Sequence, residues 1–211
     1  MLKTIAIAFA TLALASASVA QSPAPPAAAP RVAPPPTKPQ GGTYKIEPEH
    51  TRVLFAVSHL GFTTYFGEFT RPSGTLRLDP NNWPASVVDV SVPVANVLTP
   101  SERLNTELKS PEWIDAAQFP NMTFRSTGVI PTGPRSADVI GDLTLHGVTK
   151  RVTFAVHFNG AGPNPLSKAY TTGFEVRGSI NRSDFGVAKY VPLVGDKVDI
   201  IISAAFERQP S

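Results

Sequence analysis

The sequence predicts an all-β domain of eight or nine antiparallel strands. Apolar residues recur at every second position in several segments, a period typical of strands with one apolar face. Clusters of Gly, Pro and Asn separate these segments, and such residues form turns. Only one or two short helices are expected, which is too few to provide the crossover connections of a parallel sheet.

The alternation is clearest in four segments, and five others show it more weakly. In the clear segments, Val, Ile and Phe occupy one face and polar or small residues occupy the other. These segments are 53–59, 88–94, 152–158 and 198–206. The weaker strand candidates are 63–69, 74–78, 122–128, 138–145 and 171–180.

The helical candidate begins at Ser101. A serine at this position suits an N-cap, and Glu102 places a negative charge in the first turn. Leu104 and Leu108 are four residues apart and would share one face of the helix. A second short helical turn is expected at 111–116.

The N-terminal region is expected to lie outside the fold. Residues 1–20 have the pattern of a secretory signal peptide, with Lys3 before an apolar stretch at 5–14 and small residues up to a cleavage site after Ala20. The stretch is too short to cross a bilayer, so we expect export to the periplasm without stable membrane insertion. Residues 21–42 are rich in Pro and Ala and predict an extended flexible spacer, leaving 43–211 as the folded domain.

Composition excludes several classes of function. The chain has no cysteine, which excludes disulfides, thiolate metal sites and cysteine nucleophiles. Three of the 19 Lys and Arg precede Gly42, whereas all 16 Asp and Glu follow it, so the folded domain carries no net charge. A nucleic-acid partner is therefore not expected, because no net basic field would attract a polyanion.

The residues by themselves leave two questions open. Either a closed barrel or a two-sheet sandwich would bury one face of every strand. An eight-stranded barrel can hold one ligand in its interior, whereas a sandwich would use the same residues as a plain core. The alternation does not distinguish a filled core from an empty pocket.

Four ordered motifs resemble those of one known family. They are HTRVLFAVSHLGFTTYFGEF at 50–69, the FPNMTFRS run at 119–126, GDLTLHGVTKRVTF at 141–154 and INRSDFG at 180–186. Together they resemble the YceI-like family of secreted bacterial proteins. The resemblance implies an eight-stranded antiparallel lipocalin-like barrel with one or two short helices packed beside it. It also implies a lumen for a polyisoprenoid, an isoprenoid quinone or a fatty-acid derivative, with no other cofactor. The helix sequence SERLNTELKS at 101–110 departs from the family pattern, so its polar contacts are in doubt.

Apolar residues on the alternating faces, with aromatics near the first corner, are the candidates for contact with such a ligand. These are Val53, Phe55, Val57, Phe62, Phe66, Val88, Val90, Val92, Phe124, Leu143, Leu145, Phe154, Val156, Phe174, Val176, Ile200 and Ile202. The candidates for polar head-group contacts are His50, His59, His146 and Arg182. For the histidines the alternative is structural hydrogen bonding, and for Arg182 it is the shaping of a turn.

No catalytic or metal-binding motif is evident. The histidines lack the close spacing of ready-made metal sites, and the chain has no Gly-x-Ser-x-Gly and no glycine-rich phosphate loop. We therefore expect a binding protein and not an enzyme. Two alternatives remain, namely a structural module with a filled core and an enzyme that acts on a lipid head group through clustered histidines. The oligomeric state is open, a homodimer being one option.

Overall fold

The structure is a computed structural model that describes residues 38–210. Within this range it contains eleven strands, one α-helix and three short 3-10 helices. The strands are β1 Gly42–Ile46, β2 Arg52–His59, β3 Thr63–Phe69, β4 Ser73–Leu78, β5 Val87–Pro93, β6 Val97–Leu98, β7 Asn121–Gly133, β8 Ser136–Leu145, β9 Val148–Pro163, β10 Tyr170–Asn181 and β11 Val194–Arg208. The predicted signal peptide and most of the predicted spacer lie outside the described residues.

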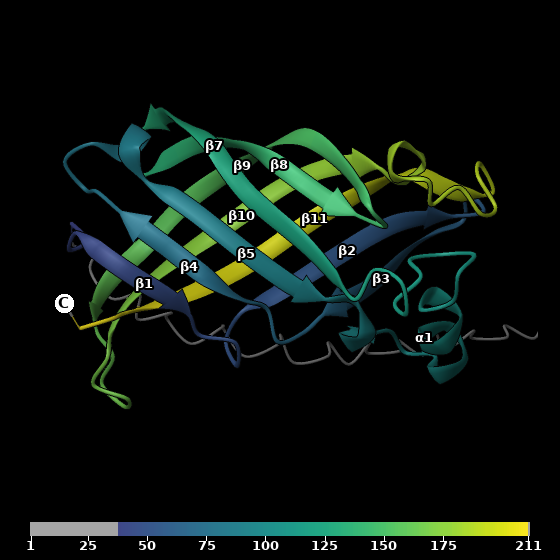
Figure 1. The fold of residues 1–211 in the computed structure, drawn as a ribbon, viewed down its shortest axis with the longest axis horizontal. Coiled ribbons are helices and arrows are strands. Elements are labelled where there is room, and N and C mark those ends of the chain that lie inside the picture. Colours follow the sequence, from purple (N-terminus) through teal and green to yellow (C-terminus); the bar gives the residue numbers. More distant parts are fainter. Residues whose placement is uncertain (1–37, 211) are drawn as a thin grey trace, which may run out of the picture. The chain divides into compact units, whose positions relative to one another are not determined.

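Eight of these strands form the closed antiparallel barrel predicted from the family resemblance (Figure 1). Their order is β1-β4-β5-β7-β8-β9-β10-β11, and the pairing of β1 with β11 closes the ring. The closing register places Tyr44 opposite Arg208 and Ile46 opposite Phe206. Two strands from opposite ends of the folded domain thus complete the barrel.

Strand β11 is long enough to pair with two different strands along one edge. Its last residues pair with β1, whereas its segment from Val194 to Ser203 pairs with β2. The sheet continues from β2 to β3 and then to the short β6. The β2–β3 hairpin therefore extends the barrel wall at the end that also carries the loop before β11, on the right in Figure 1.

The helix α1 spans Glu102–Leu108, and its predicted N-cap is confirmed. The Ser101 hydroxyl accepts a hydrogen bond from the backbone N–H of Leu104, at 3.3 Å. Leu108 packs against the barrel core, as its position on the apolar face predicted. The 3-10 helices are η1 Trp83–Ala85, η2 Val94–Asn96 and η3 Arg182–Phe185.

The LHGVT segment forms the tight β8–β9 hairpin. Its two loop residues, His146 and Gly147, have φ of 50° and 74°, the left-handed pair that defines a type I′ turn. A side chain at Gly147 would also collide with the ring of Phe119, at 2.5 Å. Both conformation and space therefore require glycine at this corner.

Two hydrophobic clusters make up the core of the barrel. One includes Phe124, Phe154 and Phe185 together with Trp113. The other gathers residues of β1, β4, β9, β10 and β11: Tyr44, Leu76, Leu78, Phe158, Ala161, Phe174, Ala204 and Phe206.

Candidate ligand cavity

A cavity of about 250 Å³ lies inside the barrel, lined by residues of both clusters. A single water molecule needs a cavity of only about 10–15 Å³, so this cavity has room for an extended apolar chain. The question that the sequence left open, between a filled core and a pocket, is thereby answered for the described barrel.

The cavity lining is almost entirely apolar. Every barrel strand contributes to it, because alternate residues of each strand point inward. Among the described residues, Arg135 is the one charged side chain on the lining. Hydroxyl groups come from Thr51, Ser86, Thr123 and Ser136. A cavity of this composition suits the tail of an amphipathic molecule and offers few groups for catalysis.

All but four of the predicted lumen residues line this cavity. Those that do so are Val53, Val88, Val90, Val92, Phe124, Leu143, Leu145, Phe154, Val156, Phe174, Val176, Ile200 and Ile202. Cross-strand pairs bring several of them together, as where Val176 faces both Val156 and Ile202. The period-two pattern therefore identified the inward face of these strands.

Glycines on neighbouring strands make room for two of the lining phenylalanines. A Cβ at Gly141 would lie 2.4 Å from the Phe124 ring, and a Cβ at Gly178 would lie 2.4 Å from the Phe154 ring. Each ring thus lies against the barrel wall, over a position that has no side chain. The two rings meet edge to face, with centroids 5.4 Å apart. This packing keeps two large side chains on the wall and leaves the centre of the lumen free.

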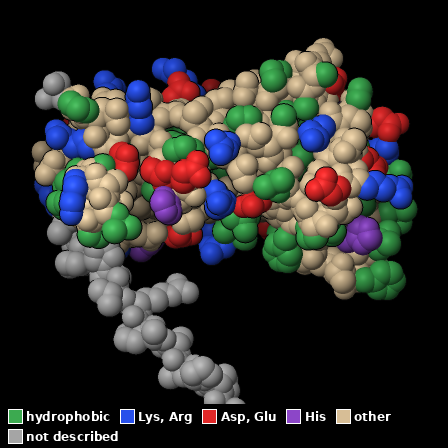
Figure 2. All heavy atoms as spheres, turned by 90° about the horizontal axis from the view of Figure 1, so that it is seen from below, with side chains coloured by type: hydrophobic (Ala, Val, Ile, Leu, Met, Phe, Trp, Pro, Cys, Tyr) green, Lys and Arg blue, Asp and Glu red, His purple; other side chains and the backbone are tan. Residues whose placement is uncertain are grey.

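The other four predicted residues, Phe55, Val57, Phe62 and Phe66, lie outside the cavity. The ring of Phe55 packs on Gly67, and Val57 pairs with Tyr65 nearer the barrel end. Phe66 is 54% exposed and Phe62 is 86% exposed. Figure 2 shows hydrophobic side chains at the right-hand end of the molecule, where the β2–β3 hairpin lies in Figure 1. At the tip of this hairpin the backbone amide of Leu60 donates a hydrogen bond to the carbonyl of Leu193, at 2.8 Å.

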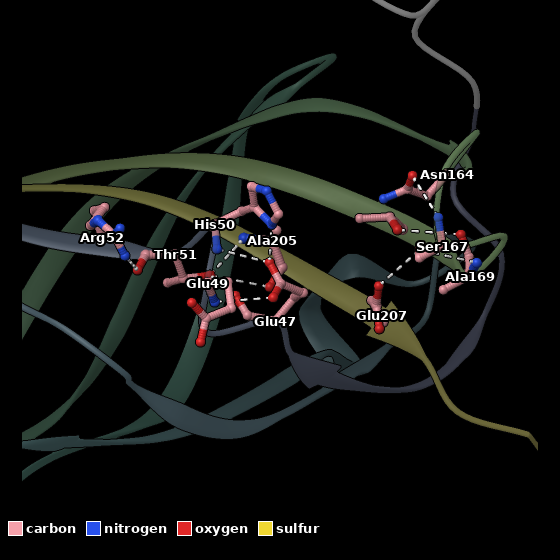
Figure 3. Close-up of polar contacts among 11 residues, drawn as sticks. Glu47, Glu49, His50, Thr51, Arg52, Asn164, Ser167, Ala169, Ala205 and Glu207 are labelled. Atoms are coloured by element: carbon pink, nitrogen blue, oxygen red, sulfur yellow. Dashed lines mark hydrogen bonds and ion pairs between the residues drawn. The ribbon is translucent and has the colours of Figure 1, made fainter.

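His50 lies on the surface beside the β1–β2 turn (Figure 3). Its Nδ1 is 2.6 Å from Oε2 of Glu47. The Glu47 carboxylate also accepts hydrogen bonds from two backbone amides of the turn, one at each oxygen. Burial raises the pKa of Glu47, but together these hydrogen bonds lower it by more than burial raises it. The net shift of the pKa is therefore downward. The adjacent Thr51 hydroxyl donates to the carbonyl of Glu47 and accepts from the amide of Ala205. The group anchors the turn to β11.

Neither His59 nor His146 reaches the cavity lining. His59 is exposed at the end of β2 and packs against the ring of Tyr65. His146 sits in the β8–β9 turn, where its Nδ1 lies 3.2 Å from the carbonyl oxygen of Phe185 and its ring meets that of Phe119. Among residues 38–210 no three His, Asp or Glu side chains are grouped to hold a metal ion.

Arg182 shapes the loop before β11 and does not line the cavity. Its side chain is 5% exposed and donates four hydrogen bonds of 2.8–2.9 Å, all to backbone carbonyls. The acceptors are Val187, Lys189, Val194 and Gly195. Burial lowers the pKa of this guanidinium, and the nearby carboxylate of Asp196 opposes that shift. These contacts agree with the interpretation that Arg182 shapes a turn.

Sequence reasoning missed several lining residues. Val139, Phe158 and Phe206 occupy the inward face of predicted strands, so the same alternation could have identified them. Trp83 and Arg135 lie outside the alternating segments, in η1 and in the two-residue loop between β7 and β8. No periodic signal marks such positions.

The match to one family model covers nearly all of the barrel. The family model described as the YceI-like domain matches residues 44–206. The chain belongs to the YceI-like family. A curated relative from Pseudomonas savastanoi pv. phaseolicola, named only as a UPF0312 protein, is 38% identical over 141 residues, which are 67% of this chain and 73% of the relative.

Solved structures share the fold of this YceI-like protein at low sequence identity. BcnA of Burkholderia cenocepacia matches with a TM-score of 0.69 at 24% identity, over 76% of this chain and 98% of its own. A domain of Saccharophagus degradans, described as polyisoprenoid-binding and implicated in plant cell wall breakdown, matches with a TM-score of 0.61 at 14% identity. That match covers 81% of this chain and all of the other. No helix among residues 38–210 combines the length and apolarity needed to cross a membrane.

Proposed function

We propose that this protein binds a long isoprenoid or fatty-acyl chain inside the barrel and shields it from water. The observation that carries the proposal is the apolar cavity, whose described lining has a single charged side chain. The name of the Saccharophagus domain, a polyisoprenoid-binding protein of the same fold, supports the same class of ligand. The role would be sequestration or transport in the periplasm, in accord with the signal peptide predicted at residues 1–20.

The energetics of burial suit a long tail. Each methylene group withdrawn from water contributes about 0.8 kcal/mol, so a chain of 16 carbons contributes on the order of 13 kcal/mol before costs. Association and ordering cost roughly 4–15 kcal/mol. Short chains would therefore dissociate readily, whereas chains that fill the lumen would be retained. Selection by length follows from the cavity without any specific polar contact.

The two alternative functions lack matching features in the described residues. A structural module would need a filled core, whereas the barrel encloses about 250 Å³. An enzyme acting on a lipid head group would need grouped histidines with a carboxylate at the cavity. Of His50, His59, His146 and His157, none lies on the lining. Binding without chemistry is therefore the function we propose.

The proposal can be tested by identifying what the protein carries. The mature chain would be purified from its own cell envelope without detergent, analysed by native mass spectrometry and extracted with organic solvent. We expect a stoichiometric adduct that extraction identifies as an isoprenoid or fatty-acyl compound. An unliganded mass, together with no uptake of added quinones, polyprenyl compounds or fatty acids, would contradict the proposal and favour the structural module.

A further inference from the structure

The cavity lining carries one charge, and it sits at the end formed by the β7–β8 hairpin. Arg135 is one of two residues that connect paired Gly133 and Ser136. The 3-10 helix η1, with Trp83 on the lining, lies at this same end, at the upper left in Figure 1. A tail that fills the lumen would leave its polar end beside such a rim.

The Arg135 side chain is held in place from several sides. Its backbone carbonyl accepts a hydrogen bond from the Phe158 amide at 2.8 Å. Its Nε donates to the Phe158 carbonyl at 2.9 Å, and its Nη2 donates to the Asn159 carbonyl. The guanidinium also lies over the Phe158 ring, 5.7 Å from the ring centroid. These contacts orient the group before any ligand arrives, which reduces the ordering cost of binding.

Part of the guanidinium remains without a protein partner. Nη1 donates no hydrogen bond within residues 38–210, and no described carboxylate lies within 4.0 Å to form an ion pair. Ser136 and Trp83 also line the cavity, and the side chain of neither forms a hydrogen bond with another described group. The cavity lining thus combines an arginine that has unpaired N–H donors with the absence of any acidic side chain among its described residues. Such a lining is complementary to an oxyanion, because guanidinium groups bind phosphate and carboxylate oxygens through paired N–H donors.

We propose that Arg135 binds the anionic head group of the chain held in the lumen, through a phosphate or carboxylate oxygen. This inference rests on the proposed function and adds the chemistry of the head group. It distinguishes an isoprenyl phosphate or a free fatty acid from a neutral alcohol or quinone. Phe158 connects the site to the lumen, since its ring contacts both Arg135 and the Trp83 ring, whose centroid is 6.4 Å away.

The test compares anionic and neutral probes that share a tail. Geranylgeranyl phosphate is compared with geranylgeraniol, and palmitate with 1-hexadecanol, by isothermal titration on the mature protein. We expect at least one anion to bind more than tenfold more tightly than its alcohol. The pair that shows the larger preference identifies phosphate or carboxylate as the natural head group. Arg135→Gln should lower the affinity for that anion by about 10- to 100-fold and leave its alcohol within about threefold.

Two further variants separate recognition from structure. Arg135→Lys retains the charge and should recover part of the preference for the anion, whereas Arg177→Gln, on the exposed face of β10, should change neither affinity. Equal affinity of the natural protein for anion and alcohol would overturn the role of Arg135 and leave the lipid-binding proposal standing. An equal loss for both probes in Arg135→Gln would also overturn it, by making Arg135 a structural residue of the rim. If no probe of either kind binds, both proposals fail.

Discussion

The guanidinium of Arg182 lies over the indole ring of Trp113, with 5.5 Å between its Cζ and the ring centroid. Trp113 is 7% exposed and belongs to the hydrophobic cluster that includes Phe124, Phe154 and Phe185. Lys189, in the same loop as the carbonyls that Arg182 binds, forms ion pairs with Glu112 and Glu107. The loop before β11 and the segment that includes and follows the end of α1 are thus held together.

Replacement of Arg182 by Met should destabilise the fold. The substitution leaves four backbone carbonyls without their charged donor, so the free energy of unfolding should fall by about 3 kcal/mol or more. Urea unfolding monitored by circular dichroism would measure it. The matched control is Arg177→Met on the exposed face of β10, which should change stability by no more than about 0.5 kcal/mol. A loss below about 1 kcal/mol for Arg182→Met would contradict the account of this loop.

Gly178→Ala should both destabilise the barrel and reduce the volume of its cavity. The new Cβ would lie 2.4 Å from the Phe154 ring and would push it toward the lumen. Overpacking of this kind costs about 1–3 kcal/mol, and the shifted ring would occupy space for the ligand. The control is Gly162→Ala, where no atom lies within 4 Å of the added Cβ. Thermal unfolding and palmitate titration of both variants would measure the effects, and equal behaviour of the two would argue against the packing described.

The contribution of the buried Tyr44 to stability should decrease at alkaline pH. Burial raises the pKa of its hydroxyl to about 12, and the neighbouring Tyr170 adds to the shift. In the unfolded chain a tyrosine ionises near pH 10. The stability that Tyr44 contributes is therefore complete below pH 10 and is lost as the pH rises toward 12.

Tyr44→Phe provides the measurement. At pH 8 the variant should be less stable by about 1 kcal/mol, because it lacks the bond from the hydroxyl to the Gln40 carbonyl, 2.6 Å long. The gap between natural protein and variant should narrow at pH 11, as urea unfolding at both pH values would record. A gap that stays constant or widens would be inconsistent with a raised pKa.

Affinity should depend steeply on tail length. If each methylene enters an apolar lumen, each should raise the affinity about fourfold. A series of saturated fatty acids from 8 to 20 carbons, titrated one by one, would show this slope. The slope should end at the tail length that fills the cavity. Affinities that are independent of length would exclude the lumen as the binding site.

Much of the wall of the barrel followed from the sequence, because alternation reports directly which face of a strand is buried. Val156, Val176 and Ile202 were assigned to the lumen on that basis, and they line it. Closure was not derivable from alternation, since the partners Tyr44 and Arg208 lie at opposite ends of the folded domain. It came from the resemblance to the family.

The polar contacts of the site could not be predicted from the alternation of apolar residues. Arg135 stands in a two-residue loop, and loop residues have no periodicity that tells where a side chain points. For Arg182, in a corner motif, the sequence left two roles open, a head-group contact and the shaping of a turn. Its acceptors are instead backbone carbonyls of the following loop, whose positions depend on tertiary folding. Chemistry-bearing residues in loops therefore need the three-dimensional structure.

The measurement that tests the central claim most directly is the binding of palmitate by two variants of adjacent residues. Val156 lines the cavity, whereas Ala155 is exposed on the outer face of the same strand. Circular dichroism would first establish that both Val156→Arg and Ala155→Arg are folded. The account predicts that Val156→Arg abolishes binding, because a charged side chain then occupies the apolar lumen, and that Ala155→Arg binds as the natural protein does. A folded Val156→Arg protein that retains full affinity would contradict the assignment of the lumen as the binding site.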